Sequence, residues 1–306
     1  MCDSAHVIYW KNSLKLAPNF TIKGYSRAAE NTGFYCAELD MAFDAGCQTN
    51  DIPAFICLSH LHSDHTAALH KMLIDNPKKP IIFIPNNAKF EELLITCLKN
   101  LYLASKFIHP MSKKGMDPNS KYPYTIVKLD VGQCYKFKES KGSAYYVEGL
   151  PANHGVTSIS FGIYQMRIRC QAQYKNLDKK EYVKMKEQHI DFTEIYKHHI
   201  FCYMSDTNIK PLIKYPQMIL SYPVVMVECT FLEQSDLPHA KKKNHMHWLH
   251  LEPIIRNTLG VKFLLIHFSK KYTWSQIKIF FDQVHNNNPL FNVGLWLQPE
   301  LVHYYV

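Results

Sequence analysis

Four side chains that commonly bind metals occur within six residues, directly after an apolar run. The stretch ICLSHLHSDH places His60, His62, Asp64 and His65 behind the strand-like residues 54–59. The first two histidines alternate along extended chain, whereas the aspartate and the third histidine begin a helix. One such loop can hold two metals, the first on the two alternating histidines and the second on the aspartate and its neighbour. Imidazole and carboxylate suit zinc, and manganese and iron stay open.

Short apolar runs recur along the chain, and helical patterns separate several of them. Runs of strand length cover 54–59, 143–153, 200–205, 224–229 and 261–266. Helical patterns cover 65–75, 88–104, 178–188 and 273–284. Alternating strands and helices without an internal repeat predict a single α/β layered domain over 1–306. A surface insertion is expected around 105–125.

Composition narrows the class of protein. The chain has 306 residues, of which 47% are hydrophobic, enough to bury a large core. No apolar run reaches the roughly 18 to 20 residues that a membrane span requires. The N-terminus MCDSAHVIYW lacks the regions of a signal peptide, and the nine cysteines form no C-x-x-C pair. These features predict a soluble protein with reduced thiols in the cytoplasm, with the nucleus as an alternative.

The charge pattern gives a weak signal for a polyanionic partner. The formal net charge is +9, but many basic proteins of this size bind no nucleic acid. The lysines gather in scattered patches at 78–79, 113–114, 179–180, 241–243 and 270–271. Each patch alone is typical of a solvated surface.

The motif SHLHSDH resembles the signature of metallo-β-lactamase-fold hydrolases. This resemblance implies an αββα sandwich, with mixed sheets, outer helices and two Zn²⁺ at one edge. It also implies further ligands in LPANHGV, CYMSDTN and LLIHFSKKY, which are His154, Asp206 and His267. In that pattern His154 completes the first metal site, His267 completes the second, and Asp206 bridges both.

Further segments resemble particular parts of this fold. Asp44 in MAFDAGC resembles the turn aspartate that orients a ligating histidine, although a plain turn aspartate is the alternative. The segment VVMVECTFLE resembles the H-E-A-T segment of the ribonuclease Z branch, with Val227 and Cys229 departing from it. Glu228 and His245 match that branch's proton-transfer pair, with a loop carboxylate and a solvent-facing histidine as the alternative. The resemblance thus implies Asp64, Glu228 and His245 as catalytic residues.

One segment departs from the ribonuclease Z pattern. The branch has an RNA-gripping arm rich in Gly and Pro, but residues 163–205 contain neither. A short basic segment over 167–199 is therefore expected in its place, with a compact helix that would not reach as far. Four lysines of this segment are candidates for phosphate contacts: Lys179, Lys180, Lys184 and Lys186.

The chemistry expected from these residues is metal-dependent hydrolysis. Two adjacent metals lower the pKa of a bridging water toward 7 and stabilise charge on a phosphoryl or carbonyl oxygen. A charged His245, held by Glu228, could protonate the departing O3′ of an RNA. We therefore predict an endoribonuclease that cleaves structured RNA such as a tRNA precursor 3′ trailer. A small-molecule hydrolase and a metal-stabilised RNA-binding module are the alternatives, and a homodimer is open.

Overall fold

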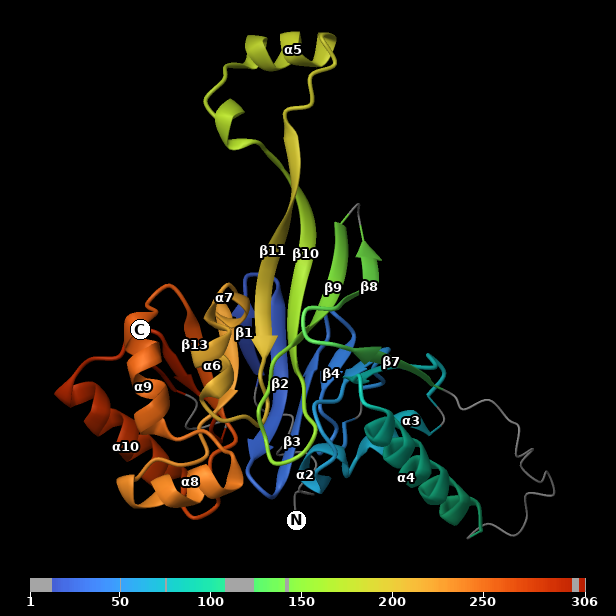
Figure 1. The fold of residues 1–306 in the computed structure, drawn as a ribbon, viewed down its shortest axis with the longest axis vertical. Coiled ribbons are helices and arrows are strands. Elements are labelled where there is room, and N and C mark those ends of the chain that lie inside the picture. Colours follow the sequence, from blue (N-terminus) through green and yellow to red (C-terminus); the bar gives the residue numbers. More distant parts are fainter. Residues whose placement is uncertain are drawn as a thin grey trace, which may run out of the picture.

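The computed structural model describes residues 13–49, 51–74, 76–107, 124–140, 143–298 and 303–305. Within these ranges the chain forms two β-sheets with helices on their outer faces (Figure 1). No helix in the described ranges is both long and apolar enough to cross a membrane. The predicted insertion around 105–125 falls mainly on 108–123, which lie outside the described residues.

The first sheet has seven strands in the order β1-β2-β3-β4-β5-β6-β7. β1 to β4 pair antiparallel, and β4 to β7 pair parallel. The strands are β1 Ser13–Ala17, β2 Phe20–Arg27, β3 Asn31–Cys36, β4 Met41–Phe43, β5 Phe55–Cys57, β6 Ile81–Pro85 and β7 Thr125–Leu129.

The second sheet has eight strands in the order β15-β14-β13-β12-β11-β10-β9-β8. β11 to β14 pair parallel, and the strands on both sides of them pair antiparallel. The strands are β8 Cys134–Ser140, β9 Ser143–Leu150, β10 Ser160–Cys170, β11 Thr193–Tyr203, β12 Val224–Glu228, β13 Lys262–Ile266, β14 Val293–Leu295 and β15 His303–Tyr305.

Helices cover the outer face of each sheet. On the side of the first sheet lie α2 Ser63–Thr66, α3 Leu69–Leu73 and α4 Ala88–Phe107 (Figure 1). On the side of the second lie α6 Lys210–Lys214, α7 Pro216–Ile219, α8 Leu237–Lys243, α9 Trp248–Asn257 and α10 Trp274–Asn287. The 3₁₀ turns are η1 Ala172–Tyr174 and η2 Gln234–Asp236, and α5 Lys179–Glu187 stands apart from both sheets.

The alternation of side chains along the central strands builds three apolar layers. In β13, Leu264 and Ile266 enter the core between the sheets, whereas Phe263 and Leu265 pack against the helices outside. Both faces are apolar because both are covered, as is usual for parallel strands. The predicted αββα sandwich is confirmed.

The strand ends gather the polar loops at one edge of the sandwich. The carboxyl ends of β4, β5, β11, β12 and β13 lead directly into the segments that carry the predicted site residues. Neighbouring parallel strands end at the same edge of a sheet, which is where open α/β sheets bind their ligands. This explains why residues far apart in the sequence meet there.

The expectation of a compact segment over 167–199 was wrong. We call these residues the arm, and Figure 1 shows them rising from the sandwich as a two-stranded ribbon with α5 at its far end. β10 and β11 have 11 residues each and stay paired from Phe161 with Tyr203 to Cys170 with Thr193. A strand of this length spans about 33 Å. An extended ribbon needs neither Gly nor Pro, so their absence did not indicate a short segment.

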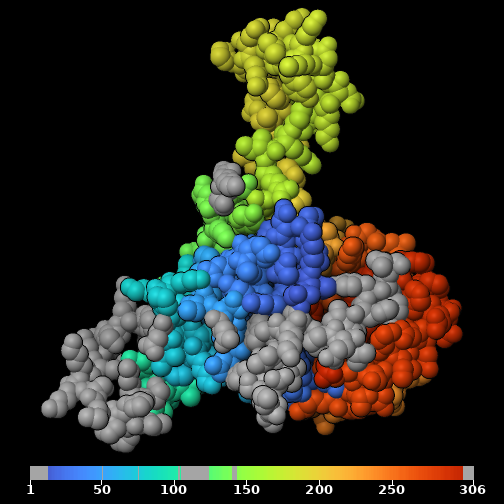
Figure 2. Space-filling view, turned by 180° about the vertical axis from the view of Figure 1, so that it is seen from behind, coloured from blue at the N-terminus to red at the C-terminus, as the bar shows by residue number. Residues whose placement is uncertain are grey.

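The far end of the arm is closed by a capped helix. Asp178 accepts a hydrogen bond from the backbone N–H of Glu181 at 2.8 Å, and the Glu181 side chain accepts one from the backbone of Asp178 at 2.8 Å. This reciprocal cap satisfies two donors that a helix start leaves open. Figure 2 shows from behind that the arm stands clear of the body of the molecule.

Candidate metal centre

Three imidazoles and one carboxylate converge beyond the end of β5. Nε2 of His60 lies 3.1 Å from Nδ1 of His62, which lies 3.2 Å from Nε2 of His154. Oδ2 of Asp206 is 3.8 Å from the His60 nitrogen and 3.9 Å from the His154 nitrogen. Around a tetrahedral zinc ion with bonds of about 2.0 Å, neighbouring ligand atoms lie ~3.3 Å apart. The four atoms therefore fit one divalent cation.

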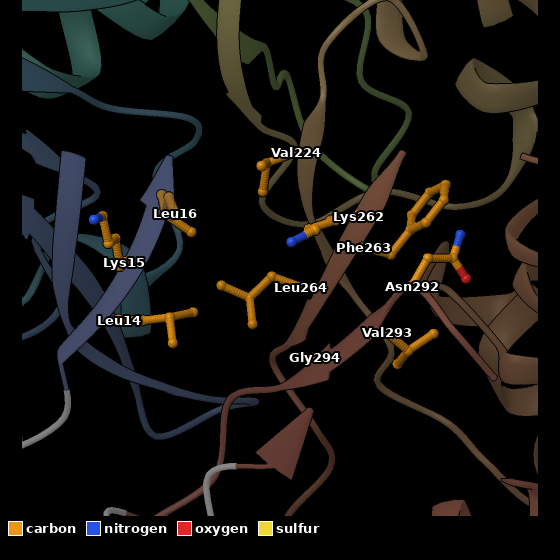
Figure 3. A pocket seen from close by; sticks show the side chains of 10 residues that line it. All are labelled: Leu14, Lys15, Leu16, Val224, Lys262, Phe263, Leu264, Asn292, Val293 and Gly294. Carbon is orange, nitrogen blue, oxygen red and sulfur yellow. The ribbon is translucent and has the colours of Figure 1, made fainter. Parts of the chain in front are cut away.

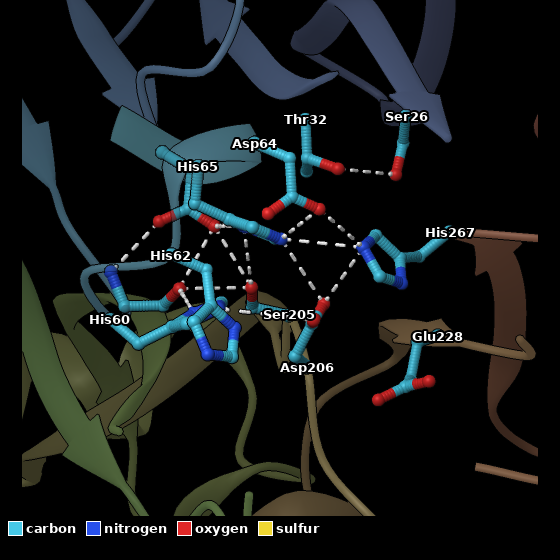
Figure 4. A network of polar contacts seen from close by, with 12 residues as sticks. Ser26, Thr32, His60, His62, Asp64, His65, Ser205, Asp206, Glu228 and His267 are labelled. Carbon is cyan, nitrogen blue, oxygen red and sulfur yellow. Dashed lines mark hydrogen bonds and ion pairs between the residues drawn. The ribbon is translucent and has the colours of Figure 1, made fainter. Parts of the chain in front are cut away.

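A second group of ligand atoms lies beside the first (Figure 4). The Nε2 atoms of His65 and His267 are 3.3 Å apart, and Oδ2 of Asp64 lies 3.6 Å and 3.5 Å from them. Oδ1 of Asp206 is 3.4 Å from the His65 nitrogen and 3.3 Å from the His267 nitrogen. Asp206 thus offers one oxygen to each group, which is the arrangement that a bridging ligand requires.

A positive charge near Asp206 would stabilise its buried carboxylate. Its Oδ1 is buried and has no hydrogen-bond donor, an arrangement that is costly for a carboxylate. Burial opposes ionisation, yet the neighbouring His267 and His65 hold the pKa of Asp206 well below its usual value. Burial likewise opposes protonation of His65, but Asp206 and Asp44 raise the pKa of His65 well above its usual value. The cluster as a whole therefore favours a cation.

The ring nitrogens that point away from the centre have partners that fix each imidazole. Their contacts are His60 Nδ1 with Ser59 Oγ at 2.9 Å, His65 Nδ1 with Asp44 Oδ2 at 2.7 Å, His154 Nδ1 with the Asn244 carbonyl at 3.3 Å and His267 Nδ1 with Thr230 Oγ1 at 3.2 Å. A nitrogen that donates outward leaves the opposite nitrogen as an acceptor for a metal. His62 differs because it presents Nδ1 to the centre.

Asp44 organises the buried side of the site. Besides His65, its carboxylate accepts hydrogen bonds from the Ser59 backbone at 2.8 Å, the Ser205 hydroxyl at 2.8 Å and the Tyr203 hydroxyl at 2.6 Å. Burial opposes its charge, but His65 lowers the pKa of Asp44 on balance. The interpretation of Asp44 as a plain turn residue does not account for these contacts.

Three residues of this region have left-handed backbone conformations. Asp44 has φ of 53°, Ser205 has φ of 50°, and His267 has φ of 60°. Such values are uncommon for residues other than glycine and cluster at functional sites. At each position the chain has just left a strand and turns sharply toward the centre.

Glu228 and His245 form a pair beside the first ligand group. Nδ1 of His245 lies 3.0 Å from both carboxylate oxygens of Glu228, and it lies 3.9 Å from Oδ2 of Asp206. Glu228 also accepts the backbone N–H of Thr207 at 2.6 Å and the hydroxyl of Thr230. Burial opposes protonation of His245, but the attraction of Glu228 outweighs it and raises the pKa of His245 to about 9.

Comparison with known proteins finds similar chains by sequence and by fold. No protein-family model matches the chain. A chloroplastic tRNase Z, TRZ2 of Arabidopsis thaliana, is 25% identical over 274 residues, covering 85% of this chain and 70% of that protein. A second tRNase Z of that plant, TRZ1, is 23% identical over 272 residues, covering 85% and 89%. The metallo-β-lactamase fold protein YhfI of Bacillus subtilis superposes with a TM-score of 0.52 at 13% identity, covering 90% of this chain and 94% of that chain.

The chain has the metallo-β-lactamase fold and is tRNase Z-like. All residues predicted for the site of this tRNase Z-like chain meet at one edge of the sandwich. The predicted ligands are His60, His62, Asp64, His65, His154, Asp206 and His267. Their roles in binding metal, and the roles of Asp64, Glu228 and His245 in catalysis, stay predictions.

Several residues that the sequence analysis left without a role support the site. Thr230 joins Glu228 to His267 because its hydroxyl lies within hydrogen-bond distance of both. Ser59 and Ser205 each precede a predicted ligand, and their hydroxyls lie 2.9 Å apart. A small hydroxyl residue next to a ligand was the available signal, but such residues are too common to single out.

The ligand cluster lies at the wall of a large cleft. This cleft has a volume of about 860 Å³, and its walls include His62, His154, Asp206 and His245. A separate cavity of about 360 Å³ lies between β1 and β13 (Figure 3). Its lining is mostly apolar and contains no carboxylate or imidazole, so it lacks the groups that hydrolysis needs.

Proposed function

We propose that this chain is a metal-dependent endoribonuclease that removes 3′ trailers from tRNA precursors. The observation that carries the proposal is the Glu228–His245 pair beside the double ligand cluster. Expulsion of an O3′ alkoxide from a phosphodiester needs a proton donor, and a charged His245 held by Glu228 is placed to supply it. The similarity to two tRNase Z proteins over 85% of the chain supports the same function.

His245 is the proposed general acid. Its Nδ1 is engaged by Glu228, so Nε2 is the nitrogen left for the cleft that His245 lines. The carboxylate keeps the imidazole charged and fixes its orientation, and the proton then passes from Nε2 to the leaving O3′. The seven ligand residues would hold two divalent cations, which supply Lewis-acid charge for water activation and for the phosphoryl oxygens. Zinc is the proposed metal because of the mixed imidazole and carboxylate donors.

Asp64 has a second proposed role beyond ligation. Its Oδ2 accepts the backbone N–H of Ala29 at 3.0 Å and faces the second ligand group. A carboxylate at this position orients the attacking water and takes up its proton.

The decisive experiment offers the purified protein two substrates side by side. One is a tRNA precursor with a 3′ trailer, and the other is a coloured cephalosporin. We expect cleavage of the precursor to leave a 3′ hydroxyl on the tRNA, with no change in the cephalosporin. Turnover of the cephalosporin without cleavage of RNA would favour the small-molecule alternative, and metal-dependent RNA binding without cleavage would favour the binding module.

A further inference from the structure

The cleft beside the site is lined by lysines from two segments of the chain. One wall comes from α8 and from the loop after β13, and it carries Lys242, Lys243 and Lys270. The uncharged residues of the lining, Ala28, Ala29, Gly155 and Val156, come from the loops after β2 and β9, and the backbone N–H of Ala28 donates to the carbonyl of Phe268 in the loop that carries Lys270. We call Lys242, Lys243 and Lys270 the cationic wall. All three side chains are exposed.

The charge of the cationic wall is not balanced by the protein. Within the described ranges, none of its three lysines has an ion-pair or hydrogen-bond partner for its ammonium group. The neighbouring Lys271 differs, because its ammonium lies 2.6 Å and 2.8 Å from the two carboxylate oxygens of Asp236. Asp236 also accepts the hydroxyl of Tyr272. Lys271 also lies 3.7 Å from Oε2 of Glu233. Both carboxylates therefore contact Lys271, and among the described residues neither forms an ion pair with a lysine of the cationic wall.

The general acid gives the bound strand a direction. His245 follows α8 directly, and its backbone N–H donates to the carbonyl of Ala240 at 3.0 Å. The O3′ that His245 protonates belongs to the nucleotide on the 5′ side of the cleaved bond. That nucleotide therefore lies beside His245 at the end of α8, close to Lys242 and Lys243 on the same helix.

Building on the proposed function, we propose that the cationic wall binds the phosphates immediately 5′ of the cleaved bond. Lysine binds a phosphate mainly as a point charge, so the wall reads the backbone and not the bases. The choice of substrate then depends on the phosphate charges on the 5′ side of the cleaved bond and little on the trailer.

The test uses short single-stranded RNA oligonucleotides with neutral methylphosphonate linkages. One set has two neutral linkages on the 5′ side of the cleaved bond, and another set has them on the 3′ side. Wild-type protein should lose about tenfold in kcat/KM with the 5′ set, about what one charge-assisted contact contributes. It should lose less than twofold with the 3′ set.

A triple variant shows which lysines are responsible. Lys242→Ala, Lys243→Ala and Lys270→Ala together should remove the difference between the two sets. The salt dependence of kcat/KM should also weaken, by about 0.7 in log–log slope for each lost contact. Lys241→Ala with Lys262→Ala is the matched control, because Lys241 lies on the same helix and neither residue lines the cleft. Circular dichroism and metal content check that each variant is folded.

The outcomes separate this inference from the proposed function. A larger loss with the 3′ set, or a 5′ preference that survives in the triple variant, would overturn the wall assignment while RNA cleavage itself stands. The wall assignment would also be overturned if the salt dependence of kcat/KM were weaker in the Lys241→Ala, Lys262→Ala control than in the triple variant. If the wild type cleaves no oligonucleotide and no precursor, the proposed function fails, and this inference fails with it.

Discussion

The arm and the cationic wall both present lysines, but they differ in distance from the reaction centre and in charge balance. The arm carries eight Lys and Arg residues against five Asp and Glu residues, whereas the wall has three lysines, and the nearby carboxylates of Glu233 and Asp236 both contact Lys271. β11 alone separates α5 from Asp206 by about 33 Å. This distance is several times the screening length in physiological salt, so charges on α5 are largely screened from the site. The arm can therefore touch only a distant part of a folded RNA.

We expect the effect of a substitution on activity to decrease with the distance of the residue from Asp206. Replacement of Asp206 by Ala should abolish activity and release at least one metal per chain, because its two oxygens face the two ligand groups. Elemental analysis and precursor cleavage measure the two effects. Asp191→Ala on the arm is the control and should retain both. Less than one metal per chain in zinc-grown wild-type protein would contradict the dinuclear interpretation.

The proton-transfer pair should give the next largest effect. His245→Ala and Glu228→Gln should each slow cleavage by about 10²- to 10⁴-fold while both metals stay bound, since neither residue is a predicted ligand. The double variant should lose little more, because the two act as a unit. Single-turnover rates and metal content test this, with His250→Ala on the surface of α9 as the control. Metal loss in place of slower chemistry would argue against the pair's proposed role.

Asp44 should act on metal binding more than on the chemical step. Asp44→Asn should weaken metal affinity by about 10- to 100-fold, the usual effect of changing a residue that holds a ligating imidazole. Metal titration with a competing chelator measures the affinity, and Asp51→Asn on the surface is the control. An unchanged affinity in a folded variant would leave Asp44 with a purely structural role.

The charge of His245 can be tested without turnover. In metal-free protein the pKa of His245 is raised to about 9 because the attraction of Glu228 outweighs burial, so the imidazole is protonated at neutral pH and loses its proton as the pH rises through that value. Glu228→Gln should lower the pKa of His245 by one unit or more. NMR titration of the chelated protein measures both. A pKa that does not move would remove Glu228 as the source of the charge.

The contrast between the two regions also shows what the sequence could predict. The cluster from His60 to His65 was predictable from its spacing behind an apolar run, whereas His154, Asp206 and His267 were predicted from the resemblance to metallo-β-lactamase-fold hydrolases. The fold brings all of them to one edge of the sandwich. Val227 and Cys229, the departures in the Glu228 segment, are fully buried and pack in the outer core, so they leave the site intact. The cationic wall was not predictable, because Lys242 and Lys270 lie in separate segments that only the fold joins.

The arm was mispredicted for a different physical reason. Its ribbon has Ile168 opposite Ile195, both about 70% exposed, so its strands lack the buried face that makes a strand recognisable from its pattern. The sequence signal was instead the helix at its tip, which was predicted over 178–188 and spans Lys179–Glu187. Pairing between the two strands carries that helix outward, and such pairing is a long-range property.

The smallest predicted effect belongs to the arm lysines, and it separates the role of the arm from the role of the cationic wall. Replacing Lys179, Lys180, Lys184 and Lys186 with Ala should raise KM for a whole tRNA precursor about threefold to tenfold and weaken its salt dependence. The same variant should cleave the short oligonucleotides as wild type does, because they cannot span the distance from the site to α5. The cationic-wall variant should instead be impaired on both substrates. Equal losses on both substrates in the arm variant would mean that α5 supports the fold of the protein and not the docking of a distant part of the RNA.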